Sequence, residues 1–119
     1  MKELDVYLIP EDLSKVSKIL DKHNVVARAK HDVQGSGRSK RKEIHEVVDS
    51  RMTGRKFIPK FEKRTHLLAF VPDSSAKKIV EEILNSLGKK SEPRGLVFIK
   101  EISNAYEIGT KKSGDSILT

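Results

Sequence analysis

A chain of 119 residues with 36% hydrophobic residues is long enough for one domain with one modest core. Its 24 Lys and Arg against 17 Asp and Glu, a net charge of +7, indicate either a nucleic-acid partner or a lysine-rich solvated surface, and for the body of the chain we prefer the second interpretation. The absence of cysteine excludes disulfides and thiolate metal sites and fits a reducing compartment. No apolar run approaches the roughly 18 residues of a membrane span. Acidic residues fall where a signal peptide would be apolar, so we expect a cytoplasmic protein.

The first part of the chain predicts a strand, a helix and a second strand. Residues 3–9 alternate and then run apolar, which predicts a strand. Pro10 ends this strand because proline has no N–H to donate. Asn24 suits the left-handed end of the helix that follows. The apolar stripe of this helix has helical spacing and consists of Leu13, Val16, Ile19 and Leu20. Residues 25–33 then alternate and predict the second strand.

The same order recurs in the second half. Residues 65–71 have enough consecutive apolar side chains to predict a strand buried on both faces. Pro72 ends this strand, and Asp73 or Ser74 is expected to cap the next helix. The apolar stripe of that helix consists of Ala76, Ile79, Val80, Ile83, Leu84 and Leu87. Residues 96–102 predict a fourth strand.

Two successive strand–helix–strand units predict an α+β, ferredoxin-like double βαβ fold, with a four-stranded antiparallel sheet and two helices on one face. We expect a single domain over 1–119, with a long connection at 35–60 and a mobile C-terminal tail at 106–119. Three apolar residues could instead dock the tail: Ile108, Ile117 and Leu118. The uncovered face of the sheet implies burial against other copies of the chain.

The connection at 35–60 holds most of the excess charge. It has eight Lys and Arg against three Asp and Glu, a net +5 of the chain's +7. A connection of this length without clear structure is uncommon in a compact domain and is usually functional or disordered. We interpret it as a partner-binding loop. The cations that would contact the partner are Lys40, Arg41, Lys42, Arg51, Arg55 and Lys56.

Nucleic-acid binding is the alternative interpretation of this loop. The same cations, together with Arg38, could bind the phosphates of RNA or DNA. An RNA-binding sheet of this fold needs aromatic side chains on its central strands. The strands expected there offer only Tyr7, Phe70 and Phe98. Nucleic acid is therefore the second hypothesis, after a protein partner.

The sequence predicts neither a metal site nor catalysis. Its four histidines show no metal-ligand spacing and are interpreted as hydrogen-bonded or solvent-facing: His23, His31, His45 and His66. No Ser/His/Asp group and no carboxylate pair stands out. We therefore expect a protein that is not an enzyme.

Short motifs at both ends of the loop carry a family resemblance. The loop opens with Gly35–Ser36–Gly37–Arg38, in which glycines let backbone N–H groups approach an anion and the arginine adds charge. A simple strand-ending turn is the alternative, because no helix follows as in a dinucleotide fingerprint. The loop closes with Phe57–Ile58–Pro59–Lys60, and Ala105–Tyr106 follows later. With the double βαβ pattern, these motifs resemble the PII signal-transduction family of nitrogen and carbon regulators.

The resemblance implies a homotrimer with nucleotide sites in the clefts between subunits. The long loop, called the T-loop in that family, would control a transporter or a metabolic enzyme. By position, Gly35, Gly37 and Arg38 would lie against the nucleotide, and Lys60 would occupy the place of a lysine that helps bind 2-oxoglutarate. The expected ligand is an adenine nucleotide: ATP, ADP, AMP or cyclic AMP. The expected site also includes Lys90, Arg94 and Gly95.

Several family residues are replaced in this chain. Leu96 stands where the family has a phosphate-binding lysine, and Glu107 and Gly109 stand where it has an Arg-x-Arg pair. Ser39 replaces a glutamine linked to Mg²⁺ and 2-oxoglutarate. Because a hydrogen bond to a charged group contributes roughly 1.5–3 kcal/mol, we expect weakened ATP–Mg²⁺–2-oxoglutarate sensing. Five cations lie near enough in sequence to substitute: Lys89, Lys90, Arg94, Lys111 and Lys112.

Overall fold

The computed structural model of the chain describes residues 1–38, 44–46, 55–57, 60–88 and 92–119. In these ranges the elements follow in this order: β1 (Lys2–Leu8), the 3₁₀ turn η1 (Pro10–Asp12), α1 (Leu13–Lys22), β2 (Arg28–Gly35), β3 (Ile44–Glu46), β4 (Arg55–Phe57), β5 (Glu62–Val71), α2 (Asp73–Leu87), β6 (Gly95–Glu101) and the 3₁₀ turn η2 (Asp115–Ile117). No helix among the described residues has both the length and the apolar character needed to cross a membrane.

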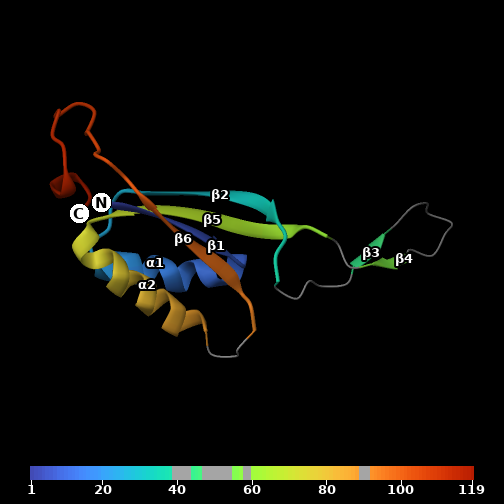
Figure 1. Cartoon of the computed structure of the whole chain (residues 1–119). Coiled ribbons are helices and arrows are strands. Elements are labelled where there is room, and N and C mark those ends of the chain that lie inside the picture. Colours follow the sequence, from blue (N-terminus) through green and yellow to red (C-terminus); the bar gives the residue numbers. More distant parts are fainter. Residues whose placement is uncertain (39–43, 47–54, 58–59, 89–91) are drawn as a thin grey trace.

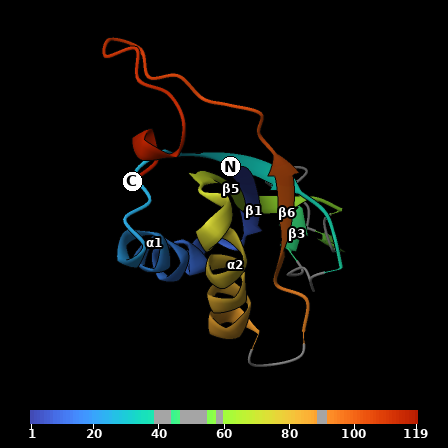
Figure 2. The same ribbon diagram turned by 60° about the vertical axis from the view of Figure 1, so that its left-hand side comes forward.

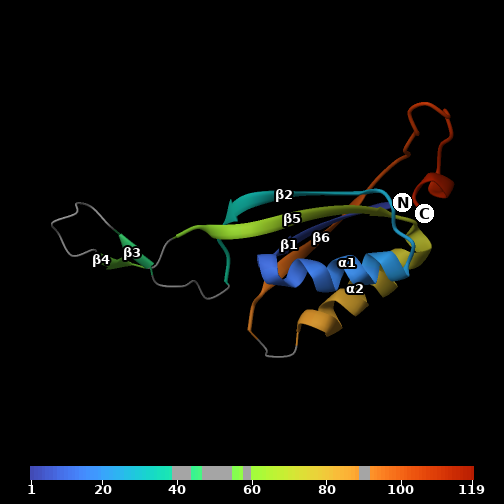
Figure 3. The ribbon, with the colours of Figure 1, turned by 180° about the vertical axis from the view of Figure 1, so that it is seen from behind.

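The main sheet has the strand order β2-β5-β1-β6, and every pair is antiparallel. Both helices cover the same face of this sheet, and the opposite face is open (Figures 1 and 2). The view from behind in Figure 3 shows the same two layers. The ferredoxin-like double βαβ fold predicted from the sequence is therefore confirmed.

Alternate residues of the central strands build the core. In β1, Leu4, Val6 and Leu8 are buried under the helices. The corresponding positions of β5 are buried too, whereas Leu68 and Phe70 on its other face are only partly buried. The prediction of a strand buried on both faces is therefore wrong for the single chain, because helices cover only one side. The core cluster consists of Leu4, Val6, Leu8, Val16, Leu20, Val25, Leu67, Ala69, Val71, Ala76, Ile79 and Ile83.

The strands on either side of the loop run further toward it than predicted. β2 begins at Arg28 instead of residue 25 and continues to Gly35, which pairs with Glu62 at the start of β5. β1 ends earlier, where Leu8 pairs with Thr65. The β2–β5 pair therefore continues past the end of β1 as a two-stranded arm that supports the base of the loop.

The predicted end of α1 agrees with the structure, whereas the predicted cap at the start of α2 does not. Asn24 has the predicted left-handed conformation, with φ +57°. The expectation that Asp73 or Ser74 caps α2 is wrong, because Pro72 occupies the N-cap position and no side chain caps the helix. The carboxylate of Asp73 instead pairs with the N-terminal amine of Met1 at 3.0 Å. The hydrogen bond from this amine lowers the pKa of Asp73 below its usual value.

The C-terminal tail contacts the core at its far end. Leu118 is only 2% exposed, and its carbonyl accepts a hydrogen bond from the N–H of Val26 at 3.1 Å. Ile108, in contrast, is fully exposed. Of the apolar residues considered as anchors, Leu118 docks and Ile108 does not. The mobility expected for 106–119 stays a prediction.

The buried face of α2 provides a test of the core assignment. Ile79 is 0% exposed and lies in the core cluster, so Ile79→Ala is expected to lower the free energy of unfolding by about 2–5 kcal/mol. Lys78→Ala, one residue away on the exposed side, should change it by less than about 0.5 kcal/mol. Urea denaturation followed by circular dichroism measures both. Equal losses for the two variants would contradict this packing.

Candidate functional site

The predicted residues Gly35, Gly37, Arg38 and Lys60 lie at or just beyond the paired ends of β2 and β5, where the loop begins and ends. Gly35 is the last residue of β2, Gly37 and Arg38 follow it, and Lys60 lies two residues before the start of β5. A Cβ atom at Gly35 would lie 3.3 Å from Cγ of Arg64, whereas one at Gly37 would meet nothing within 4 Å. The backbone at Gly35 is thus closely packed against the neighbouring strand.

Arg94 and Gly95, the other described residues of the predicted site, lie at the opposite edge of the sheet. Gly95 begins β6 and pairs with Leu8, and a Cβ atom there would lie only 2.1 Å from the carbonyl oxygen of Tyr7, so no other residue fits without a backbone shift. β2 and β6 are the two edge strands. Since neighbouring strands lie about 4.8 Å apart, the two edges are separated by about 14 Å. One chain therefore places both groups at the same end of the sheet without bringing them into contact.

Arg94 forms a bidentate ion pair with Asp12, which the sequence analysis did not predict. Its Nε and Nη2 donate to the two carboxylate oxygens of Asp12 at 3.1 and 3.0 Å, and Asp12 is only 2% exposed. The hydrogen bond and the charge of Asp12 raise the pKa of Arg94. Paired hydrogen bonds of this kind are strong and geometrically specific. Two of the donors that Arg94 would offer an anion are thus engaged in joining the start of β6 to η1.

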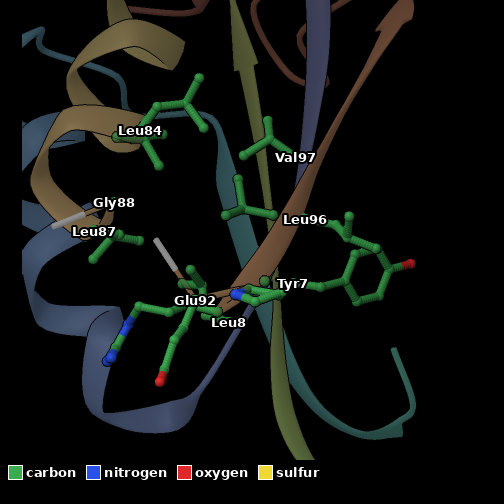
Figure 4. A pocket seen from close by; sticks show the side chains of 13 residues that line it. Tyr7, Leu8, Leu84, Leu87, Gly88, Glu92, Leu96 and Val97 are labelled. Carbon is green, nitrogen blue, oxygen red and sulfur yellow. The ribbon is translucent and has the colours of Figure 1, made fainter. Parts of the chain in front are cut away.

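A cavity lies between the end of α2 and β6 (Figure 4). Leu84 and Leu87 line it from the helix, and Leu96 and Val97 line it from the strand. Gly88 permits the close approach at the helix end, since a Cβ atom there would lie 2.6 Å from the Leu84 carbonyl oxygen. The lining suits an apolar group better than a phosphate.

The partner-binding residues are only partly described. Four of them lie outside the described residues: Lys40, Arg41, Lys42 and Arg51. The same is true of Lys90, from the expected nucleotide site, and of Ser39. Arg55 and Lys56 belong to β4, which pairs antiparallel with β3 as a two-stranded ribbon. Figure 1 shows this ribbon beyond the ends of β2 and β5. The pairing of β3 with β4 therefore gives part of the predicted loop a regular structure, which the sequence analysis did not predict.

Two of the family departures lie in a tight turn of the tail. Gly109 has φ +102°, a conformation that side chains other than glycine rarely adopt. The turn is closed by hydrogen bonds from the Lys111 N–H to the Glu107 carbonyl at 3.0 Å and from the Glu107 N–H to the Lys112 carbonyl at 2.7 Å. An arginine at position 109 would therefore strain the turn that this chain forms.

The open face of the sheet carries a polar cluster that the sequence analysis missed. His66 contacts Asp5 through Nε2 at 2.8 Å and His31 through Nδ1 at 3.3 Å. Tyr7 stacks on the His66 ring with a centroid distance of 4.3 Å. Burial raises the pKa of the Asp5 carboxyl, but its interactions with Glu3, His66 and Lys100 together lower it. Only the register of β2, β5 and β1 brings these residues together, so sequence spacing held no signal for them.

The Arg94–Asp12 pair makes a prediction about stability. Arg94→Gln leaves the buried carboxylate of Asp12 without its charged partner, which should lower the free energy of unfolding by about 1–3 kcal/mol. Arg38→Gln, an exposed arginine at the loop base, should change it by less than about 0.5 kcal/mol. Denaturant titration of both variants measures the difference. A harmless Arg94→Gln would show that the pair does not hold β6 to η1.

Comparisons with known proteins agree with this architecture. The family model for Nitrogen regulatory protein P-II matches residues 1–112. The nitrogen fixation nifHD region GlnB-like protein 1 of Methanothermobacter marburgensis is 31% identical over 116 residues, covering 96% of this chain and 99% of that protein. The structure of B. subtilis GlnK superposes with a TM-score of 0.71 at 22% identity, covering 98% of this chain and 97% of that one. The chain therefore belongs to the P-II nitrogen regulatory protein family, a family of non-enzymatic signalling regulators.

Proposed function

We propose that this chain is a trimeric regulator that binds an adenine nucleotide, or another small anion, in clefts between subunits and controls a partner through residues 35–60. Proteins of this family generally bind adenine nucleotides and are typically trimers. The observation that carries the proposal is the β2–β5 arm, which holds Gly35 and the residues after it beyond the end of β1. A transporter or an enzyme of nitrogen or carbon metabolism is the proposed partner.

The loop base is the proposed point where ligand binding and partner binding meet. Backbone N–H groups near Gly35 and Gly37, with the guanidinium of Arg38, supply donors and charge for an anionic group. A ligand bound there favours those loop conformations that also contact it. The cations further along the loop then meet an acidic surface of the partner. The mechanism is ligand-linked selection of a loop conformation, without a chemical step.

The sheet geometry supports a site shared between copies. The residues near Gly35 and those near Gly95 lie on opposite edge strands of one sheet. A closed trimer lets the edge of one copy approach the edge of the next, so a ligand could contact both groups. The open face also exposes large apolar side chains, with Leu96 55% and Phe98 48% exposed, which association would bury.

Weakened 2-oxoglutarate-linked sensing is part of the proposal. Leu96 replaces a cation with an apolar side chain, and Arg94 already donates twice to Asp12. Gly109 has a φ of +102°, which an arginine at this position would adopt only with strain. We therefore propose that the chain responds to an adenine nucleotide alone more than to the combined ATP–Mg²⁺–2-oxoglutarate signal.

Calorimetric titration tests the ligand. The panel is ATP, ADP, AMP, cyclic AMP and 2-oxoglutarate, with and without Mg²⁺, and light scattering records the mass of the assembly. We expect heat from at least one adenine nucleotide, and Arg38→Ala should weaken its binding roughly tenfold or more, since a hydrogen bond to a charged group contributes about 1.5–3 kcal/mol. Lys77→Ala, an exposed cation on α2, is the matched control and should bind normally. A panel without heat, or a monomer in solution, would refute the proposal.

Nucleic-acid binding is the second candidate, favoured by the net +5 charge of residues 35–60. If it is the true function, the protein is retained on an RNA or DNA column and its affinity falls steeply as salt rises. Under the first proposal we expect the protein to elute at moderate salt. Retention at physiological salt that Arg41→Ala and Lys42→Ala together remove would favour nucleic acid instead.

A further inference from the structure

His31 and His66 lie opposite one another on the open face of the sheet. They are register partners in the antiparallel β2–β5 pair. Nε2 of His31 and Nδ1 of His66 are 3.3 Å apart, and the two rings are inclined by 69°. The His31 residue is exposed, while the His66 side chain is 12% exposed. Two imidazole nitrogens thus lie side by side on the β2–β5 pair, on the face of the sheet that the helices of the same chain leave open.

The orientation of His66 is set by its neighbours. A carboxylate can only accept hydrogen bonds, so Nε2 of His66 donates its proton to Asp5 Oδ1 at 2.8 Å. In the neutral ring, the lone pair of Nδ1 then faces His31. Tyr7 stacks flat on the His66 ring, with 6° between their planes, and Phe98 packs edge-on against Tyr7. Carboxylate and aromatic neighbours therefore fix both the tautomer and the plane of this ring.

We propose that His31 and His66 form a two-histidine binding site for a divalent transition-metal ion such as Zn²⁺. Tetrahedral coordination with metal–nitrogen distances of about 2.0–2.1 Å places two ligand nitrogens about 3.3–3.4 Å apart. The observed separation of 3.3 Å matches this value. A carboxylate on the far nitrogen of a ligating histidine is the usual second partner at such sites, because it orients the ring and increases its basicity. Asp5 occupies that position.

The charges around the pair are compatible with a bound cation. Asp5 is 3% exposed and Glu3 lies on the same strand face, so two carboxylates face this region from β1. Two cations lie near this region. Lys100 of β6 has its Nζ 3.4 Å from Asp5 Oδ2 and 3.4 Å from Glu3 Oε2. Arg64, two residues from His66 on the same face of β5, is paired with Glu62 through Nη1 at 3.3 Å. Lys100 contacts the carboxylates, whereas His66 Nδ1 faces β2. The metal would therefore bind beside a neutralised acidic group, away from the ammonium.

The chain itself supplies two ligands. No group of three or more His, Cys, Asp or Glu side chains in the described part of the chain is arranged around a metal position. The remaining coordination positions are left to water or to a neighbouring copy, so the affinity should be lower than that of a closed structural zinc site. To bind the metal, His31 must present the lone pair of Nε2, which requires its other tautomer. Because the chain supplies two ligands, metal binding should be reversible and should depend on the metal concentration.

Titration of the untagged 119-residue chain with ZnCl₂ at about pH 7.5 tests the proposal, since imidazole binds a metal in its neutral form. MgCl₂ is the control ion, because imidazole ligands suit zinc and not magnesium. We expect one Zn²⁺ per chain and a rise in melting temperature with Zn²⁺ but not with Mg²⁺. His31→Gln removes an exposed ligand and should abolish both effects. His45→Gln removes a histidine from β3, outside this sheet, and should leave both unchanged.

Two further measurements separate a metal site from a simple histidine pair. Asp5→Asn keeps the side-chain size but loses the orienting charge, and the affinity for Zn²⁺ should fall about 10- to 100-fold. Lowering the pH to about 5.5 should weaken binding, because protons compete with the metal for the same nitrogens. The proposal is overturned if His31→Gln binds Zn²⁺ as the parent does, if His45→Gln loses the binding, or if the parent gives no Zn²⁺-dependent heat or melting shift.

Discussion

The position of β1 between β5 and β6 is the constraint on which the rest of the structure depends. Because side chains alternate along a strand, this one strand contributes side chains to both faces of the sheet. Leu4, Val6 and Leu8 pack under the helices and form the centre of the core. Asp5 and Tyr7 point to the other face, where they meet His66 across the strand pair. A shift in register of one residue would exchange the two faces and destroy the core and the polar cluster together.

The length of β1 also determines where the functional loop begins. β1 ends at Leu8, and Pro10 prevents the ladder from continuing, whereas β2 and β5 remain paired up to Gly35 and Glu62. The loop base therefore rests on two strands without helix cover. The opposite edge of the sheet is secured differently, by the Arg94–Asp12 pair at the start of β6. At this end of the sheet, the β2–β5 pair holds the base of the loop and an ion pair fixes the start of β6. This arrangement suits a domain that binds a partner through a projecting loop.

The candidate site shows where sequence reasoning stops. The residues around Gly35 lie at the loop base as expected, because local motif and strand pairing agree. Arg94 was interpreted as an anion-binding residue, yet its nearest carboxylate, Asp12, is 82 positions away in sequence and became visible only in the folded chain. The sequence predicts that Asp73 caps a helix, but in the folded chain its carboxylate forms an ion pair with the N-terminal amine of Met1. Each difference comes from a partner distant in sequence, which no local pattern contains.

The sequence by itself determined the order and type of the main elements, the two helical stripes, the strand alternation and the cationic loop, since these follow from local periodicity and composition. It also carried the family motifs at both ends of that loop. Only the tertiary structure decided the strand order, the burial of Leu118, the ion pair that engages Arg94, and the meeting of His31 with His66. These depend on register and packing between distant segments, and a chain can satisfy the same local pattern with many different pairings until it folds.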